Sequence, residues 1–233
     1  MTDYTVTELN LSRQNLQVLP DLSLYTNLQT LHCEKNQLIS LDNLPPNLRE
    51  LHCYNNQLTS LDNLPHNLQI LFCRENKLTF LDNLPPNLLQ LYCSQNQLTS
   101  ITNISPTLQE LTCSHNLLTS LDNLPPNLQI LDCSSNQLTS LDNLPSNLRA
   151  LYCYNNQLTS LDTLPPNLQK LYCSFNQITS LDNLPPNLQK FDCSNNPIYT
   201  TCENMYGFIL SIKTIEKYNK IKYLENECCP LLK

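Results

Sequence analysis

The sequence predicts a curved repeat solenoid in which every turn adds one strand to a parallel β-sheet on the concave face. The first observation behind this prediction is a period of 20 residues that runs without drift from Leu28 to Asn196. The second is a Leu-x-Cys pattern that occurs once in every period, and the third is a proline-containing segment between these patterns. One unit, from Leu28 to Asn47, reads LQTLHCEKNQLISLDNLPPN.

The Leu-x-Cys pattern predicts a short strand with one buried face. In the first unit Leu31 and Cys33 alternate with His32, so the leucine and the cysteine point inward while the histidine points outward. Only one strand fits in each unit, and the chain must return before the next, so successive strands are expected to pair in parallel.

The return segment is predicted to be extended. It ends in Leu44-Pro45-Pro46-Asn47, and proline fixes φ and removes a backbone donor, which favours extended or polyproline geometry. A return segment of this length leaves no room for a full α-helix. We therefore expect thin convex legs behind the sheet.

The chain divides into three parts that we expect to form one structural domain. Residues 1–27 form a degenerate N-terminal repeat or cap, and residues 28–198 form nine 20-residue repeats. Residues 199–233 break the pattern, and their apolar residues recur every three to four positions from Met205 to Leu224. This periodicity predicts an amphipathic helix that caps the open C-terminal end.

The unit L-x-x-L-x-C-x-x-N-x-L resembles the consensus of the leucine-rich repeat family. The 20-residue length with Leu-Pro-x-Asn is similar to the short bacterial type found in secreted effectors of pathogens. The recurring segment SLDNLPPNLQ is also similar to the sequences of leucine-rich proteins of giant amoeba viruses. The resemblance implies a fold of the α/β-horseshoe class that presents a binding surface, and a viral or bacterial effector directed at a host.

Composition excludes several classes of function. The 233 residues include one glycine, which argues against Gly-rich phosphate loops, and the net charge of −7 argues against a nucleic-acid partner. No apolar run is long enough for a membrane helix, and the N-terminus has no signal-peptide pattern. We expect no membrane or nucleic-acid partner and an intracellular protein, acting in a host cytoplasm.

Three positions of the repeat carry the same polar or reactive residue in most units, and each such set of residues is called a column here. We expect all three columns to be structural. The asparagines from Asn36 to Asn196 should bond to backbone groups of their own and the neighbouring turn. The cysteines from Cys33 to Cys193 should be reduced, buried thiols, with disulfides and soft-metal binding as the alternatives. The aspartates that begin at Asp42 should accept backbone N–H bonds, with a calcium row as the alternative.

Outward-facing strand positions carry the candidate binding residues. Aromatic side chains, Arg and Lys gather there in two patches, and such residues commonly anchor protein interfaces. The C-terminal patch comprises Tyr152, Tyr154, Tyr172, Phe175, Lys170 and Lys190, and the N-terminal patch comprises His32, His52, Phe72, Tyr92, Tyr54 and Arg74. The alternative is that these rings only stabilise the sheet by pairing across strands.

No enzymatic function is predicted. His32, Glu34, Glu50 and His52 converge enough to raise the question of a metal, but we expect none, because two histidines on adjacent strands arise easily. We therefore predict a monomeric, cofactor-free adaptor or scaffold that binds a protein, possessing neither catalytic nor metal-binding residues. The alternative is a structural or self-assembling component, such as a virion-associated one.

Overall fold

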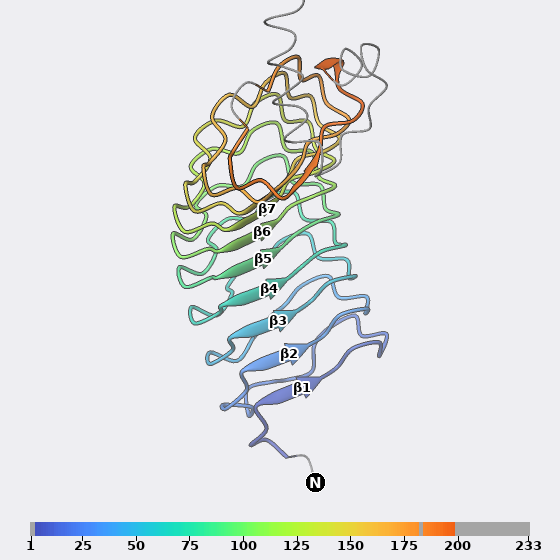
Figure 1. Cartoon of the computed structure of the whole chain (residues 1–233). Helices are drawn as coiled ribbons and strands as arrows, with labels where there is room; N and C mark the ends of the chain where they lie inside the picture. The colour runs from blue at the N-terminus through green and yellow to red at the C-terminus, as the bar shows by residue number, and fades with distance from the viewer. Residues whose placement is uncertain (1–2, 182–183, 199–233) are drawn as a thin grey trace, which may run out of the picture.

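The computed structural model describes residues 3–181 and 184–198, which form an elongated stack of turns (Figure 1). Each turn contributes a three-residue strand, and the strands form a single ten-stranded sheet in sequence order. The strands are β1 Glu8–Asn10, β2 Thr30–His32, β3 Glu50–His52, β4 Ile70–Phe72, β5 Gln90–Tyr92, β6 Glu110–Thr112, β7 Ile130–Asp132, β8 Ala150–Tyr152, β9 Lys170–Tyr172 and β10 Lys190–Asp192.

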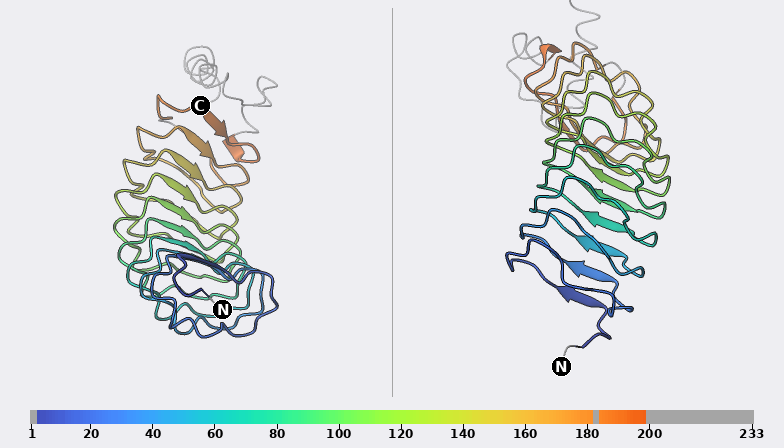
Figure 2. Two further views of the ribbon diagram at one scale, coloured as in Figure 1. Left: turned by 90° about the horizontal axis from the view of Figure 1, so that it is seen from below. Right: turned by 180° about the vertical axis from the view of Figure 1, so that it is seen from behind.

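The strands pair in parallel, with identical repeat positions opposite one another. Leu31 is the register partner of Leu51, and the same relationship continues to Leu171 and Phe191. β1 joins this register, because Leu9 lies opposite Leu31 although 22 residues separate them. Figure 2 shows the strands aligned in one row along the stack. The prediction of a parallel solenoid is confirmed, and the degenerate first unit contributes its own strand.

The core lies directly behind the sheet and runs through every described turn. Leu31, Cys33 and Leu38 are completely buried, and so are their counterparts in the following units as far as Leu171, Cys173 and Ile178. Because each buried side chain packs on the same side chain of the next turn, the core is one continuous cluster. The alternation of buried leucine with a partly exposed residue in each strand follows from the pleat.

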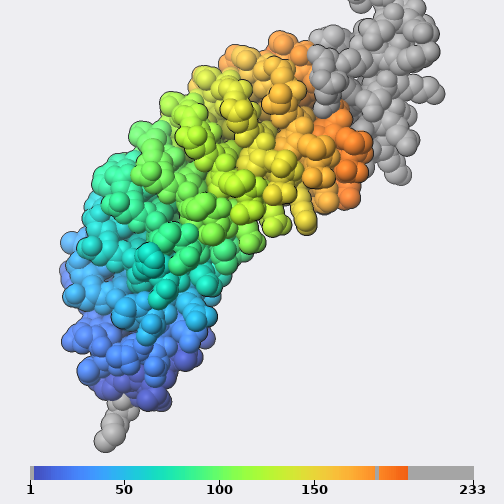
Figure 3. All heavy atoms as spheres, turned by 90° about the vertical axis from the view of Figure 1, so that its left-hand side faces the viewer, coloured from blue at the N-terminus to red at the C-terminus, as the bar shows by residue number. Residues whose placement is uncertain are grey.

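The return segments contain turns and extended chain between the strands. Each proline-containing corner is closed by a backbone bond, such as Leu48 N–H to the Pro45 carbonyl at 3.2 Å. Between β1 and β10, the described residues include no α-helix, and the return segments consist of turns, bends and irregular chain. Figure 3 shows the resulting body bent along its length. The predicted C-terminal capping helix, at 199–233, lies outside the described residues.

The asparagine ladder satisfies backbone groups at each corner. Asn56 accepts the N–H of Leu38 at 3.0 Å and donates to the carbonyls of Cys33 and Cys53 at 3.1 and 3.0 Å. The same pattern recurs at the following ladder positions as far as Asn196. Each amide therefore bonds its own turn and the preceding turn, as predicted.

The cysteine ladder lies in the core. The eight members from Cys33 to Cys173 are buried, free thiols, and Cys193 is also buried. Burial raises the pKa of the Cys93 thiol to about 12, and burial with the charge of Glu34 raises the pKa of Cys33 to about 12. The thiols therefore act as small apolar side chains, whose Sγ atoms reach carbonyls such as that of His52, 3.3 Å from Cys33 Sγ.

The aspartate column differs from the prediction. Asp42, Asp62 and Asp122 are exposed, and the donors that they bind are the hydroxyl groups of serines two residues earlier, at 2.8, 2.7 and 3.1 Å. The expected backbone N–H donors are not found for these three carboxylates. Water can screen the repulsion between exposed like charges, so the column requires no dedicated counter-ion.

The divergent unit at 101–110 keeps the register of the stack. Ser105 occupies the position of the usual proline and still closes the corner, with Leu108 N–H 3.1 Å from its carbonyl. Its buried hydroxyl donates to the Pro86 carbonyl at 2.7 Å, and the Thr107 hydroxyl donates to the Leu88 carbonyl at 3.0 Å. Hydrogen bonds from these two side chains to the preceding turn thus hold the backbone at a corner where other units have a proline ring to restrict φ.

Candidate functional site

The N-terminal patch contains a continuous stack of four rings on the outward face of the sheet. His32, His52, Phe72 and Tyr92 occupy the same position in β2 to β5, and register places each one opposite the next. Their centroids are 4.3, 4.4 and 4.4 Å apart along the series. Neighbouring parallel strands lie about 4.8 Å apart, so rings at the same repeat position on adjacent strands are close together. At this spacing the rings fit face to face but not edge to face, which explains the stacking.

The C-terminal patch contains a second, shorter stack. Tyr152 and Tyr172 lie opposite each other in β8 and β9, with their ring centroids 5.2 Å apart. Lys170 and Lys190 are register partners in β9 and β10, and because Lys170 lies two residues before Tyr172 it shares that residue's face of the sheet. This part of the patch is assembled as predicted.

Two predicted members of the C-terminal patch do not join the ring stack. In the described part of the chain, Tyr154 and Phe175 form no stacked ring pair, because they follow the strands rather than lying in them. Phe175 is 58% exposed and has a φ of 55°, a left-handed conformation that is strained for a bulky residue. Because more than half of this side chain is exposed, it is accessible to a partner.

Tyr54 and Arg74 extend the N-terminal patch beyond the strand ends. The Arg74 guanidinium lies 4.8 Å from the Tyr54 ring centroid, and Lys35 Nζ lies 5.8 Å from it. Arg74 also contacts the carboxylate of Glu75 at 3.6 Å. These cation–π contacts order the basic side chains beside the ring stack.

A hollow of about 550 Å³ lies on the sheet face after the N-terminal stack. Phe72, Tyr92 and Arg74 line one side of it, and Asp132 and His115 line the other. Small residues, Ser94, Thr112 and Ser114, occupy the outward positions between these walls. Sequence analysis did not predict this hollow, although the change from aromatic to small residues along one column was a signal for it.

Carboxylates near the hollow act on two of the tyrosines of the ring stacks. Burial raises the pKa of Tyr92 to about 12, and hydrogen bonding to Glu110 and the negative charge of this carboxylate add to the effect. Burial, the neighbouring Tyr172 and the charge of Asp132 also raise the pKa of Tyr152. Both phenols therefore remain protonated at neutral pH and can donate hydrogen bonds.

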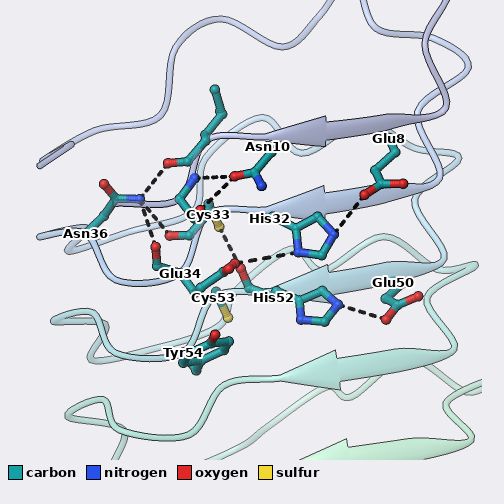
Figure 4. Close-up of polar contacts among 12 residues, drawn as sticks. Glu8, Asn10, His32, Cys33, Glu34, Asn36, Glu50, His52, Cys53 and Tyr54 are labelled. Atoms are coloured by element: carbon teal, nitrogen blue, oxygen red, sulfur yellow. Dashed lines mark hydrogen bonds and ion pairs between the residues drawn. The ribbon is translucent and has the colours of Figure 1, made fainter. Parts of the chain in front are cut away.

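A compact group of possible metal ligands lies at the N-terminal end of the ring stack (Figure 4). One ligand atom from each of His32, Glu34 and His52 lies within 4.8 Å of the other two. Glu50, the fourth residue considered from the sequence, contacts His52 from the opposite side, with Oε1 2.8 Å from Nε2. The structure thus brings all four residues together. His32, Glu34 and His52 form an inner group of possible ligands, and Glu50 lies outside this group, in contact with His52.

Two polar grooves run along the edge where the chain enters the strands. Their volumes are about 620 and 590 Å³, and amides and an arginine from successive turns line them, including Gln29, Arg49, Gln69, Gln129 and Arg149. These grooves carry no aromatic side chains. Of these three depressions, the hollow is therefore the one with an aromatic lining.

No helix in residues 3–181 and 184–198 combines the length and the apolar character needed to cross a bilayer. A model of leucine-rich repeats in two copies matches residues 106–146, 126–166, 146–186 and 166–205. No curated protein matches the chain.

Solved structures of bacterial proteins have the same fold. The leucine-rich effector YopM from Yersinia pestis is 32% identical with a TM-score of 0.78, over 83% of this chain and 58% of its own. The functional domain of InlJ from Listeria monocytogenes, which includes a cysteine ladder, is 32% identical with a TM-score of 0.65, over 82% and 49%. This chain thus spans little more than half of the YopM structure.

A Shigella effector leucine-rich repeat domain is covered over more than two thirds of its length. It is 31% identical with a TM-score of 0.60, over 66% of this chain and 71% of its own. The parallel stack, the buried leucine columns and the asparagine ladder agree with this similarity. The chain therefore belongs to the leucine-rich repeat family.

Proposed function

We propose that this protein is a non-catalytic adaptor or scaffold that binds a protein partner on the sheet face, which we take to be the concave face. Leucine-rich repeat solenoids are typically protein-interaction modules. The hollow between the two ring stacks carries the proposal. Ordered aromatic rings and an arginine around a depression are the features of interface anchors, because they bury large area with little loss of side-chain freedom.

The partner surface is proposed to comprise both predicted patches together with the hollow. Tyr152, Tyr172 and Phe72 supply ring surface, while Lys170 and Lys190 give the C-terminal end a basic character. The acidic residues around the hollow favour a partner that presents a basic or hydrogen-bonding side chain there.

The wider setting of this function is also part of the proposal. Similarity to YopM, which is described as an effector, supports a host-directed role in a host cytoplasm, and the repeat wording suggests a virus or a bacterium as source. Residues 1–27, 28–198 and 199–233 are proposed as N-terminal cap, repeats and C-terminal helical cap of one monomeric domain. The buried thiols would remain reduced in such a compartment.

A photocrosslinking experiment tests the binding face. A benzophenone amino acid replaces Phe175 in one variant and Phe80 in the other, because both rings are exposed, by 58% and 45%, and Phe80 lies in a return segment. Crosslinks to one discrete host protein are expected from position 175 and not from position 80. Equal crosslinking from both positions would reject the assigned face.

Alanine substitutions provide the second part of the photocrosslinking experiment. Tyr152→Ala combined with Tyr172→Ala should remove the crosslink made from position 175, while Phe80→Ala should leave it intact. Thermal unfolding of both variants serves as the folding control, since the two tyrosines are only partly buried. Retention of the crosslink in the double variant would contradict the proposed role of the stack.

Self-assembly is the second candidate. β1 forms one end of the sheet, and its outer edge has no strand partner among the described residues. An open edge can pair with a second chain. Light scattering after size-exclusion chromatography distinguishes the two: a monomer across concentrations agrees with the adaptor, and a concentration-dependent oligomer favours the structural component.

A further inference from the structure

The inner group of His32, Glu34 and His52 brings three possible ligand atoms within 4.8 Å of one another. His32 and His52 are register partners, and their rings are stacked with centroids 4.3 Å apart and planes 26° apart. Glu34, two residues after His32, directs Oε2 to within 3.7 Å of His32 Nδ1. The backbone of both strands is fixed by the sheet and by the core leucines behind it.

Two further carboxylates hold the far side of the imidazole rings. Glu8 Oε1 lies 3.3 Å from His32 Nε2, and Glu50 Oε1 lies 2.8 Å from His52 Nε2 (Figure 4). A carboxylate at Nε2 favours the tautomer that carries its proton there, which leaves Nδ1 as the lone-pair nitrogen. Each histidine is thereby oriented as metal-binding histidines are, with one nitrogen donating to a carboxylate.

Glu34 has a carboxylate oxygen that receives no hydrogen bond from the protein, although His32 Nδ1 lies 3.7 Å from it. Oε2 of Glu34 is buried without a hydrogen-bond partner, and among residues 3–181 and 184–198 it is the one buried side-chain nitrogen or oxygen in this condition. Lys35 and Arg74 lie over the Tyr54 ring, and neither forms an ion pair with Glu34. A buried carboxylate oxygen without a hydrogen bond is costly, and a bound cation would offset that cost.

We propose that His32, His52 and Glu34 bind one divalent transition-metal ion, through Nδ1 of each histidine and Oε2 of the glutamate. Two imidazoles with one carboxylate suit Zn²⁺ and its first-row neighbours, whereas Mg²⁺ and Ca²⁺ prefer sites built from oxygen. This conclusion departs from the expectation, drawn from the sequence, that no metal binds here. It does not depend on the proposed function.

Small side-chain movements are enough to form the site. Ligand atoms of a tetrahedral zinc ion, with bonds of about 2.0 to 2.2 Å, lie about 3.3 Å apart, and here they lie within 4.8 Å of one another. Rotation of the two rings about their side-chain bonds can close this difference without moving the strands. Three protein ligands leave a fourth position open on the outward face, for water or for a side chain of another molecule.

The neighbouring thiols are not alternative ligands. Cys33 lies between His32 and Glu34 in sequence, but its side chain is buried in the core on the opposite side of the strand. The metal site therefore uses nitrogen and oxygen ligands only, which is spectroscopically distinct from thiolate binding.

The histidine content of the chain permits a matched test. The untagged, reduced protein at pH 7.5 is titrated with ZnCl₂ by calorimetry and with CoCl₂ by absorption spectroscopy. The variants are His32→Gln with His52→Gln, Glu34→Gln, and the control His66→Gln with His115→Gln, which removes the other two histidines. Circular dichroism on heating establishes that each variant is folded.

The expected result is one ion per chain, with a Co²⁺ spectrum that lacks thiolate charge transfer. The double variant at 32 and 52 should bind at least tenfold more weakly, Glu34→Gln should also bind more weakly, and the control should bind as the parent does. Glu34→Gln also tests the proposal if the first double variant does not fold. Absence of binding by the parent, a thiolate band, or full affinity in Glu34→Gln would each overturn the site.

Discussion

The side-chain oxygen of Asn136 accepts the backbone N–H of Leu118 at 3.0 Å, which joins two turns of the solenoid through one amide. The amide nitrogen of Asn136 meanwhile donates to the carbonyls of Cys113 and Cys133 at 3.0 and 3.1 Å. This side chain therefore satisfies backbone groups that the tight corner leaves without a ladder partner.

Asn136→Ala is expected to lower the free energy of unfolding by about 2 to 4 kcal/mol, because buried backbone groups lose their partners. The control is Asn127→Ala, which removes an exposed amide with a single bond of 3.4 Å to the Pro106 carbonyl. Urea denaturation measures both variants. Equal, small losses in the two would show that the ladder amides are dispensable.

The ladder thiols should resist alkylation in the folded protein. Burial raises the pKa of Cys93 to about 12 and that of Cys113 well above its usual value, so almost no thiolate is available at pH 8. Iodoacetamide with peptide mass mapping should label the cysteines from Cys33 to Cys173 only after denaturation. Rapid labelling of Cys93 in the native protein would contradict its position in the core.

The same raised pKa values predict a loss of stability in alkali. The unfolded chain releases thiol protons above about pH 8.5, whereas folded Cys93 keeps its proton to about pH 12, so stability falls between these two values. Below about pH 8.5 the Cys93 thiol is protonated in both the folded and the unfolded chain, so the free energy of unfolding does not change with pH through this group. In Cys93→Ala, the decline of unfolding free energy with pH should be shallower by up to about 1.4 kcal/mol per pH unit. An unchanged slope would rule out this linkage.

Glu110→Gln should lower the pKa of Tyr92 from about 12 toward its ordinary value of 10.0. The neutral amide removes the negative charge that opposes phenolate formation, while burial continues to hold the pKa above 10.0. Glu50→Gln should have a smaller effect, since the charge of Glu50 is the weakest of the causes. NMR titration of ring-labelled tyrosine gives both values, and the reverse order would contradict the site geometry.

Gln95→Asn should stabilise the protein by up to about 1 kcal/mol, because asparagine tolerates left-handed backbone better than glutamine does. Gln95 has a φ of 55°, and the residues at the same repeat position in other units, such as His115 and Phe175, have φ values between 53° and 56° whatever their side chain. Gln97→Asn is the control, since Gln97 has no positive φ and is similarly exposed. Thermal unfolding compares them, and a gain in both or in neither would reject the explanation by backbone strain.

The sequence by itself determined the repeating frame of this protein. Leu31, Cys33 and Asn36 recur every 20 residues, and a fixed covalent spacing with fixed apolar positions permits one stacking register, since a slip would expose the leucines. Strand positions, core columns and the ring column that begins at His32 could all be predicted for this reason. The aspartate donors could not, because serine hydroxyls and backbone N–H groups compete locally for the same carboxylate.

Only the tertiary structure decided which outward side chains act together. The hollow beside Tyr92 depends on small residues from three turns, and the direction of Glu34 toward His32 depends on side-chain rotation. Neither follows from periodicity, because a repeat fixes where a Cα lies and which face it serves, while the side chain turns to suit neighbours on adjacent turns. Function on this scaffold therefore depends on contacts between turns, and these become visible only when the turns are stacked.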